Sequence, residues 1–467
     1  MWTRSNQLLW WMALLILASG LIYIITSLVI YSFGGLAWQG LGFPMLADMR
    51  NPTYADLRWV TANSACGVNL DDLYHRRVIG CDAFGRPGIG YPPMSIWLFR
   101  LFHFNAGWTN LLALASGLAF IAVSGYIFSR FNKNTAATML IAGLMLWSYP
   151  VQIGLEKLNI DILVYILVIL DCYLLSLSAA PWRAATSLAI IISTVGMKIY
   201  PLFGYLGLLF LSKPVARPGL SWLRLNKLDA IIILTGCTIA MISATPILFG
   251  NTALPAGSVS AGQGGLGSHG LKALGFLNQP LLRFYGLELG RWMIRSLFAM
   301  KIVSIIIGFV ITLKFRIADD IKLMIESLPT QKTSKFITYA LVSMTCMWLG
   351  CYATTISYDY RSIFLIPFIA ILPQSYMASA NKPSHKMIWA ITVATMALIP
   401  GMSTIFYWSF KIWEENLIIG HEVVAEFIMF PIVAGSAKAL IIQFLGLTSF
   451  LKHLLPAPAP ALLDPHR

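Results

Sequence analysis

The chain has little charge and very few carboxylates. Of its 467 residues only 11% are charged, and Asp and Glu together number 19. Charged residues make up about a quarter of an ordinary soluble domain. A soluble fold also has no way to bury the 58% of residues that are hydrophobic here. The shortage of charge therefore excludes a soluble globular protein and indicates a membrane protein.

Short segments of alternating polarity, the signature of a membrane β-barrel, do not account for this hydrophobicity. Apolar runs longer than about 18 residues recur along the chain instead, and these are typical of membrane-spanning helices. We expect an all-α polytopic membrane protein with one domain over residues 1–455, about 11–12 transmembrane helices and a disordered tail over 456–467. The predicted spans are 8–33, 108–129, 135–152, 159–179, 184–197, 200–212, 228–250, 292–314, 336–356, 361–379, 387–409 and 427–447.

Two of these segments are too short for a hydrocarbon core about 30 Å thick. Residues 184–197 and 200–212 are therefore either a broken helical hairpin or one kinked span.

Several catalytic signatures are missing. The chain has no P-loop, no HExxH and no Gly-x-Ser-x-Gly, which argues against ATP-driven, metalloprotease and α/β-hydrolase chemistry. The glycine-rich stretch 257–270 follows no strand, so it is not a dinucleotide-binding loop. Cysteine is also scarce, with six residues. Cys66 and Cys81 share one polar loop and are a possible disulfide if that loop faces an oxidising compartment.

Basic residues outnumber acidic ones, and the formal net charge is +14. They are scattered over many loops, so we expect no nucleic-acid partner. Their distribution places both termini in the cytoplasm by the positive-inside rule. Two large loops, over 34–92 and 251–290, then lie outside. The outer side is itself unusually basic, and a site for an anionic group such as a lipid-linked phosphate would explain this excess.

The first outer loop concentrates carboxylates that the rest of the chain lacks. Asp56 is our candidate for a general base, and its structural alternative is a helix cap or an ion pair with Arg58. Asp71 and Asp72 are adjacent, so they either bind a divalent cation or cap the helical turn that follows. We favour the cap and expect no metal.

Cations and polar groups recur at the predicted outer ends of later spans. Lys198 lies between two apolar pieces without an acidic neighbour in sequence, and either contacts a phosphate or extends to the interface. Arg361 stands at the start of a helix, where its charge opposes the helix dipole unless an anion compensates. Asn159 either caps a helix or binds substrate. The other candidate binding residues are Arg58, Tyr91, Glu156, Lys157, Arg291, Arg295 and Tyr360.

The order of these patches resembles the GT-C superfamily of membrane glycosyltransferases, and most closely the family 87 type. The resemblance covers about residues 1–375. It rests on Asp56 with Trp59, Leu73-Tyr74, Tyr91-Pro92-Pro93, Gly154 to Asn159, Lys198 to Pro201 and Tyr360-Arg361. The chain departs from the family at Glu156-Lys157, where a glutamine near the asparagine is common.

The resemblance implies a GT-C-like helix bundle in the plasma (inner) membrane with its active site on the outer, periplasmic face. The implied reaction is an inverting transfer of a sugar, mannose or another hexose or pentose, from a polyprenyl phosphate to a lipid or glycan acceptor. Asp56 would deprotonate the acceptor hydroxyl, without a cofactor, and we expect a monomer. The alternatives are a lipid-linked glycan flippase or transporter, and a glycan ligase or polymerase.

Overall fold

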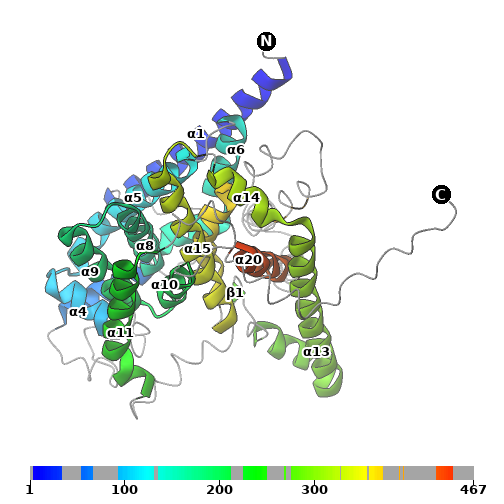
Figure 1. The fold of residues 1–467 in the computed structure, drawn as a ribbon. Helices are drawn as coiled ribbons and strands as arrows, with labels where there is room; N and C mark the ends of the chain where they lie inside the picture. The colour runs from blue at the N-terminus through cyan, green and yellow to red at the C-terminus, as the bar shows by residue number, and fades with distance from the viewer. Residues whose placement is uncertain are drawn as a thin grey trace.

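The structure, a computed structural model, describes residues 4–33, 54–66, 93–130, 135–211, 225–249, 268–269, 275–326, 328–354, 357–371, 389, 393 and 428–444. Nearly all of these residues are helical (Figure 1). The exception is a pair of two-residue strands, β1 (Ser268–His269) and β2 (Ser357–Tyr358), which pair antiparallel.

Among the described residues, four helices contain apolar stretches long enough to cross a membrane: α1 (Arg4–Phe33), α5 (Thr109–Arg130), α13 (Gly275–Phe315) and α15 (Gln331–Thr354). A fifth crossing is available if α6 (Thr135–Leu146) and α7 (Tyr149–Lys157) form one span bent by 57°. The described part of the chain is therefore that of a helical polytopic membrane protein, as predicted.

α15 forms the centre of the bundle. The apolar window of α15 is 83% buried, against 22% for that of α13. α15 packs against α8 (Ile160–Ser176) and α10 (Pro201–Phe210), and α9 (Pro181–Met197) packs between α8 and α11 (Lys227–Phe249) (Figure 1). α8 also carries Asp161, the centre of the buried polar cluster described below.

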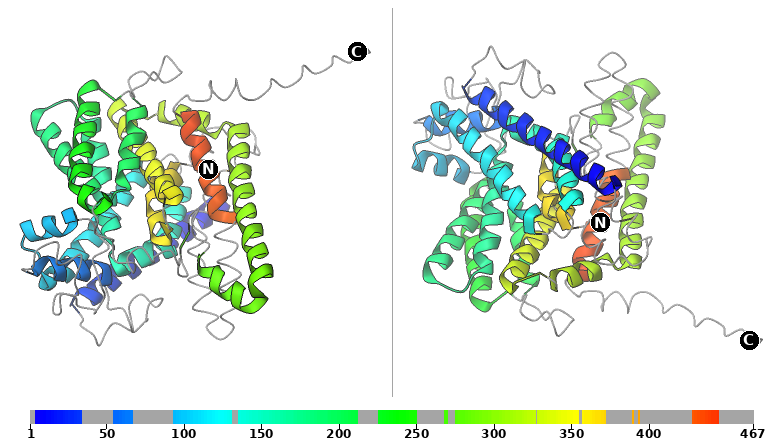
Figure 2. Two further views of the ribbon diagram at one scale, coloured as in Figure 1. Left: turned by 90° about the horizontal axis from the view of Figure 1, so that it is seen from below. Right: turned by 90° about the horizontal axis from the view of Figure 1, so that it is seen from above.

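α13 stands at the edge of the bundle and packs on α20 (Phe430–Phe444) (Figure 2). Glycines let the two backbones touch, because a Cβ at Gly308 would collide with the carbonyl oxygen of Ile432 and one at Gly435 with that of Ile305. Close approach at small residues is a common way for helices to associate in membranes.

Two short helices cover one end of the bundle. α2 (Ala55–Ala65) packs on α4 (Pro93–Leu101), and α4 packs on the end of α9. The Ser95 hydroxyl donates to the Met197 carbonyl oxygen at 3.1 Å, and a Cβ at Gly196 would lie 2.6 Å from Met94 Cγ. α4 is thus fixed against the last turn of α9.

The predicted break between residues 197 and 200 is confirmed, since α9 ends at Met197 and α10 begins at Pro201. Two other predictions were wrong in detail, and one connection holds a helix that the sequence did not predict. The bend after Leu146 starts α7, so Gly154 to Lys157 are helical rather than part of a loop. α13 begins at Gly275, well inside the loop predicted over 251–290. The connection after α13 holds an amphipathic helix, α14 (Ile317–Glu326).

Other predictions lie partly or wholly outside the described residues. Of the span predicted over 387–409 only residues 389 and 393 are described, and the tail 456–467 is not. The span predicted over 361–379 is described to residue 371. It begins as the 3-10 helix η6 (Asp359–Leu365), directly after β2.

Candidate functional site

Asp161, in the first turn of α8, is the centre of a buried charged cluster. Its side chain is 0% exposed. The Tyr200 hydroxyl donates to Oδ1, the Lys198 Nζ lies 3.7 Å from Oδ1, and the Arg361 Nε donates to Oδ2 at 3.2 Å. Three segments far apart in sequence therefore meet at one carboxylate: the start of α8, the break between α9 and α10, and η6.

The local backbone explains why Lys198 and Tyr200 reach this point. Lys198 adopts an extended conformation that ends α9, and Pro201 occupies the first turn of α10. Proline is accepted at a helix start but not inside a helix, so the chain must restart there. The Arg361 guanidinium also lies over the Tyr200 ring, 5.2 Å from its centroid.

Asn159 connects this cluster to the predicted general base. Its Oδ1 accepts a hydrogen bond from the Asp161 backbone N–H at 3.1 Å and caps α8. Its Nδ2 donates to Asp56 Oδ2 at 2.7 Å. The two readings of Asn159, a helix cap and a site residue, are therefore compatible.

Asp56 lies in the first turn of α2 and is half-buried. Burial raises the pKa of its carboxyl above the ordinary value, while the charges of Lys157 and Lys198 and the hydrogen bond from Asn159 oppose this rise. A carboxylate with a raised pKa is a stronger base than an exposed one, as general-base catalysis near neutral pH requires.

Two residues with left-handed backbones hold the Asp56 and Asn159 segments together. Tyr54, just before α2, has φ 58°, and Leu158, just before Asn159, has φ 38°. The Tyr54 N–H donates to the Glu156 carbonyl oxygen at 2.8 Å. Such conformations cost about 1–3 kcal/mol in non-glycine residues and cluster at functional sites. Here these two conformations turn the segment before Asp56 and the segment before Asn159 toward one another.

The structure thus brings together four of the predicted site residues, namely Asp56, Asn159, Lys198 and Arg361. Lys157 is near enough to Asp56 for its charge to act on that carboxyl. Glu156 is 8% exposed, and its Oε2 has no hydrogen-bond partner among the described residues. Arg58 instead donates to Asn110 Oδ1 at 3.1 Å, on α5.

Other predicted residues do not join the cluster or are not described. Arg295 is exposed on α13, and no contact between it and the Asp161 cluster occurs among the described residues. Cys66 is disulfide-bonded, but its predicted partner Cys81 lies outside the described residues, as do Tyr91, Asp71 and Asp72. The side chains of Arg291 and Tyr360 are also outside the description.

Sequence reasoning missed the central role of Asp161 and the contribution of Tyr200. A signal was present, because Asp161, Lys198 and Arg361 each stand at the end of an apolar run. Charges in such positions need partners. Here the Asp161 carboxylate is the partner of both Lys198 and Arg361.

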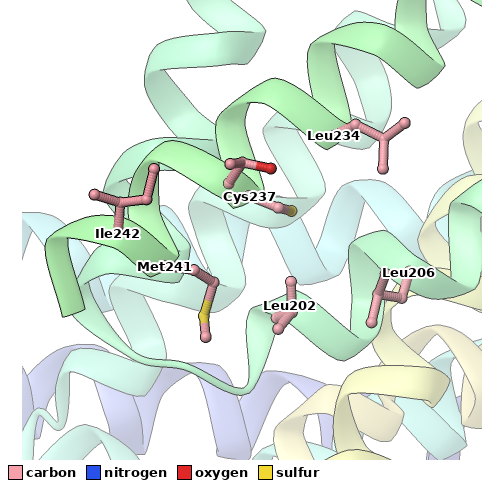
Figure 3. Close-up of a pocket in the computed structure, with 7 residues that line it drawn as sticks. Leu202, Leu206, Leu234, Cys237, Met241 and Ile242 are labelled. Carbon is pink, nitrogen blue, oxygen red and sulfur yellow. The ribbon is translucent and has the colours of Figure 1, made fainter. Parts of the chain in front are cut away.

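An apolar groove of about 400 Å³ lies between α10 and α11 (Figure 3). Leu202 and Leu206 of α10 face Leu234 and Met241 of α11 across it. The helix that forms one wall begins at Pro201, three residues after Lys198. The groove therefore shares a helix with the charged cluster.

No group of three or more His, Cys, Asp or Glu side chains arranged to hold a metal ion occurs in the described ranges. Comparison of the chain with protein-family models, with curated proteins and with solved structures finds no match.

Proposed function

We propose that this protein is an integral-membrane glycosyltransferase that moves a sugar from a polyprenyl phosphate to a lipid or glycan acceptor. The observation that carries the proposal is the meeting of Asp56, a half-buried carboxylate, with a cationic cluster at one end of a membrane helix bundle. The GT-C family 87 resemblance of the sequence motifs agrees with it. On this proposal the site faces the outer side of the plasma membrane.

Charge balance in the cluster supports binding of a phosphate. Lys198 and Arg361 carry two positive charges, and Asp161 between them supplies one negative charge. The trio therefore keeps one net positive charge in a poorly solvated place. A phosphate monoanion or diester would be held there by charge-assisted hydrogen bonds.

The apolar groove supports a lipid-linked donor. A polyprenyl chain is apolar along its length, while its phosphate is charged, so its site needs an apolar channel ending at cations. The groove is lined by α10, and Lys198 lies three residues before that helix begins. Burial of apolar chain contributes about 0.8 kcal/mol per CH₂ group.

The proposed reaction assigns one role to each group. Asp56 takes the proton of the acceptor hydroxyl, whose oxygen forms a bond to the anomeric carbon of the sugar. The bond from that carbon to the phosphate oxygen breaks, and its electron pair leaves with the polyprenyl phosphate. Lys198 and Arg361 stabilise the charge on the leaving phosphate. Attack on one face as the phosphate leaves from the other inverts the anomeric centre.

Asp56→Asn tests the proposal, because it keeps the side-chain size and removes the base. Transfer should fall by about 10²- to 10⁴-fold, the usual contribution of general-base catalysis. The assay uses purified protein, radiolabelled polyprenyl-phosphate mannose and other polyprenyl-phosphate sugars, and candidate lipid acceptors.

Asp319→Asn is the control. Asp319 is partly buried and forms an ion pair with the exposed Arg316 at the α13–α14 junction. That variant should keep full activity. Full transfer by a folded Asp56→Asn variant would remove Asp56 as the base. Absence of transfer from every polyprenyl-phosphate sugar to any acceptor would overturn the proposed function itself.

A further inference from the structure

Three aromatic rings meet at the end of α8 remote from the Asp161 cluster. Tyr173 lies in the last turn of α8, twelve residues after Asp161, which is about 18 Å along a helix that rises 1.5 Å per residue. Its ring centroid is 6.4 Å from that of Tyr126 on α5 and 5.8 Å from that of Phe336 on α15. The Tyr126 and Phe336 centroids are 5.6 Å apart. Side chains of three helices are therefore in contact here.

An exposed cation lies against each of the two tyrosines. The Arg130 guanidinium is 4.4 Å from the Tyr126 ring centroid, and Lys332 Nζ is 4.8 Å from that of Tyr173. Lys332 Nζ also donates a hydrogen bond to the Tyr173 hydroxyl at 3.1 Å. Such contacts restrict long side chains that otherwise sample many rotamers. The two positive charges are therefore held at defined positions, although both side chains are exposed.

No carboxylate of the described residues pairs with these charges. The ion pairs in the described ranges lie elsewhere, and none includes Arg130 or Lys332. The Tyr173 hydroxyl accepts from Lys332, and no acceptor for its own proton occurs among the same residues. It is thus a further donor beside the two cations. Two cations and a hydroxyl donor without a negative partner fit an oxyanion such as a phosphate group.

The position of these residues along the predicted spans favours a lipid as the source of the phosphate. Arg130 is the last residue of the apolar stretch of α5, and Lys332 is the second residue of that of α15. The ends of membrane-spanning stretches lie at the depth of the lipid headgroups, where basic and aromatic side chains are common. Anionic lipids concentrate phosphate groups at this depth.

We propose that Arg130, Tyr173 and Lys332 form a binding site for the headgroup of an anionic phospholipid, at the end of the bundle opposite the Asp161 cluster. The headgroup carries net negative charge, because a zwitterionic headgroup would bring its own cation to a place that already holds two. The bound lipid connects α5, α8 and α15. The site takes no part in the proposed transfer reaction, which occurs at the other end of α8.

The test is the binding of short-chain phosphatidylglycerol to the full-length protein in neutral detergent, measured by native mass spectrometry over a range of lipid concentrations. Phosphatidylcholine of the same chain length is the zwitterionic comparison. Phosphatidylglycerol should bind at least about tenfold more tightly, since each basic residue near a headgroup contributes appreciably to the attraction of an anionic lipid. Glycerol 3-phosphate has the same phosphate without acyl chains, and it should not displace the lipid at equal concentration.

Substitutions test each member of the site. Arg130→Ala and Lys332→Ala should each weaken phosphatidylglycerol binding about fivefold, and the double variant roughly twentyfold. Tyr173→Phe keeps the ring and removes the hydroxyl, so it should weaken binding only about two- to threefold. Lys335→Ala is the matched control, because it removes the same charge one turn later on α15. A charge that makes no direct contact is screened by salt, so this variant should bind within about twofold of the unchanged protein.

Equal losses of binding in Lys332→Ala and Lys335→Ala would mean that the lipid responds to charge density alone, and would overturn the proposal. Equal affinities for phosphatidylglycerol and phosphatidylcholine would also overturn it. So would complete displacement of the lipid by glycerol 3-phosphate at equal concentration, which would make the site one for a soluble phosphate. The assay contains no sugar donor, so its outcome is independent of the proposed transfer reaction.

Discussion

Two positions of α8, ten residues apart, carry the same residue in opposite surroundings. Asp161 and Asp171 are both 0% exposed. Asp161 accepts hydrogen bonds from Tyr200 and Arg361 and has Lys198 within 3.7 Å. Asp171 has no hydrogen-bond partner in the described part of the chain. One carboxylate is therefore paired with two cations, and the other is in no ion pair in the described part of the chain.

The difference shows that burial alone does not define the role of a membrane carboxylate. Asp161 organises cations and lets them keep one net positive charge, which suits a substrate that brings a phosphate. Asp171 instead has the hydroxyl groups of Ser187 and Tyr205 as neighbours, while the nearby Arg183 is paired with Asp229. The partners decide the chemistry, and four substitutions test whether this contrast holds.

Asp161→Asn should have the largest effect. It removes the anion between Lys198 and Arg361, whose side chains are only 14% and 11% exposed. Breaking a buried ion pair on one side costs about 3–5 kcal/mol because it leaves the partner charges uncompensated. Asp171→Asn should cost far less, since no ion pair of Asp171 occurs in the described part of the chain. The measurement is the free energy of unfolding of the two purified variants in mixed detergent. Equal losses of stability in both would contradict the contrast between Asp161 and Asp171.

Arg361→Ala should weaken donor use by about tenfold to a hundredfold, as loss of a charge-assisted contact of about 1.5–3 kcal/mol implies. KM for the polyprenyl-phosphate donor should rise more than KM for the acceptor. Arg130→Ala is the matched control, because Arg130 also lies over a tyrosine ring, that of Tyr126, at 4.4 Å. A selective rise in the acceptor KM would argue against phosphate binding by Arg361.

Asn159→Ala should change the pH dependence of transfer. The Asn159 amide donates to the charged form of Asp56 and so lowers its pKa against the effect of burial. Without it the pKa of Asp56 rises further, and less of the carboxyl is ionised at any given pH. The acid limb of the kcat/KM profile should therefore move to higher pH.

Asn105→Ala controls for the loss of a helix cap, since Asn105 caps the short helix η3 (Ala106–Trp108) through the Gly107 N–H. Its pH profile should match that of the unchanged protein. A limb that stays in place in Asn159→Ala would mean that Asp56 does not set it.

Tyr200→Phe should have the smallest effect, a loss of about 1–2 kcal/mol in stability from one hydrogen bond to a carboxylate. Arg361 should still stack on the ring, so donor KM should change by less than about threefold. Tyr165→Phe on α8, the helix that carries Asp161, is the control, because Tyr165 bonds the neutral hydroxyl of Ser124 at 3.2 Å. A smaller loss in Tyr200→Phe than in Tyr165→Phe would contradict a charged acceptor at Asp161.

Sequence patterns predicted the class of fold well, because long apolar runs leave few alternatives to helices in a membrane. They also placed the α9–α10 break, since Lys198 and Pro201 interrupt an apolar run in a way that no straight span tolerates. The bend after Leu146 was not predicted. The predicted span ended at residue 152 and a loop was expected from Gly154, but the helix that restarts at Tyr149, with Pro150 in its first turn, continues to Lys157.

The sequence predicted correctly that several residues lie near one another. It predicted their hydrogen-bond and ion-pair partners less well. Asn159 was assigned to a cap or to the site and does both. Lys198 and Arg361 were expected to bind a phosphate, and in the structure each of them also contacts Asp161. Pairing across 200 residues of sequence, as between Asp161 and Arg361, depends on tertiary packing that no local pattern records.

The hydrogen bond from Ser95 to the Met197 carbonyl oxygen connects α4 directly to the segment that carries Lys198. Met94 of α4 also packs against Gly196, two residues before Lys198. A displacement of α4 would therefore act directly on the position of Lys198. If the proposed donor binds at Lys198, its affinity would be thermodynamically linked to the position of α4, and a larger residue at Gly196 should change that linkage.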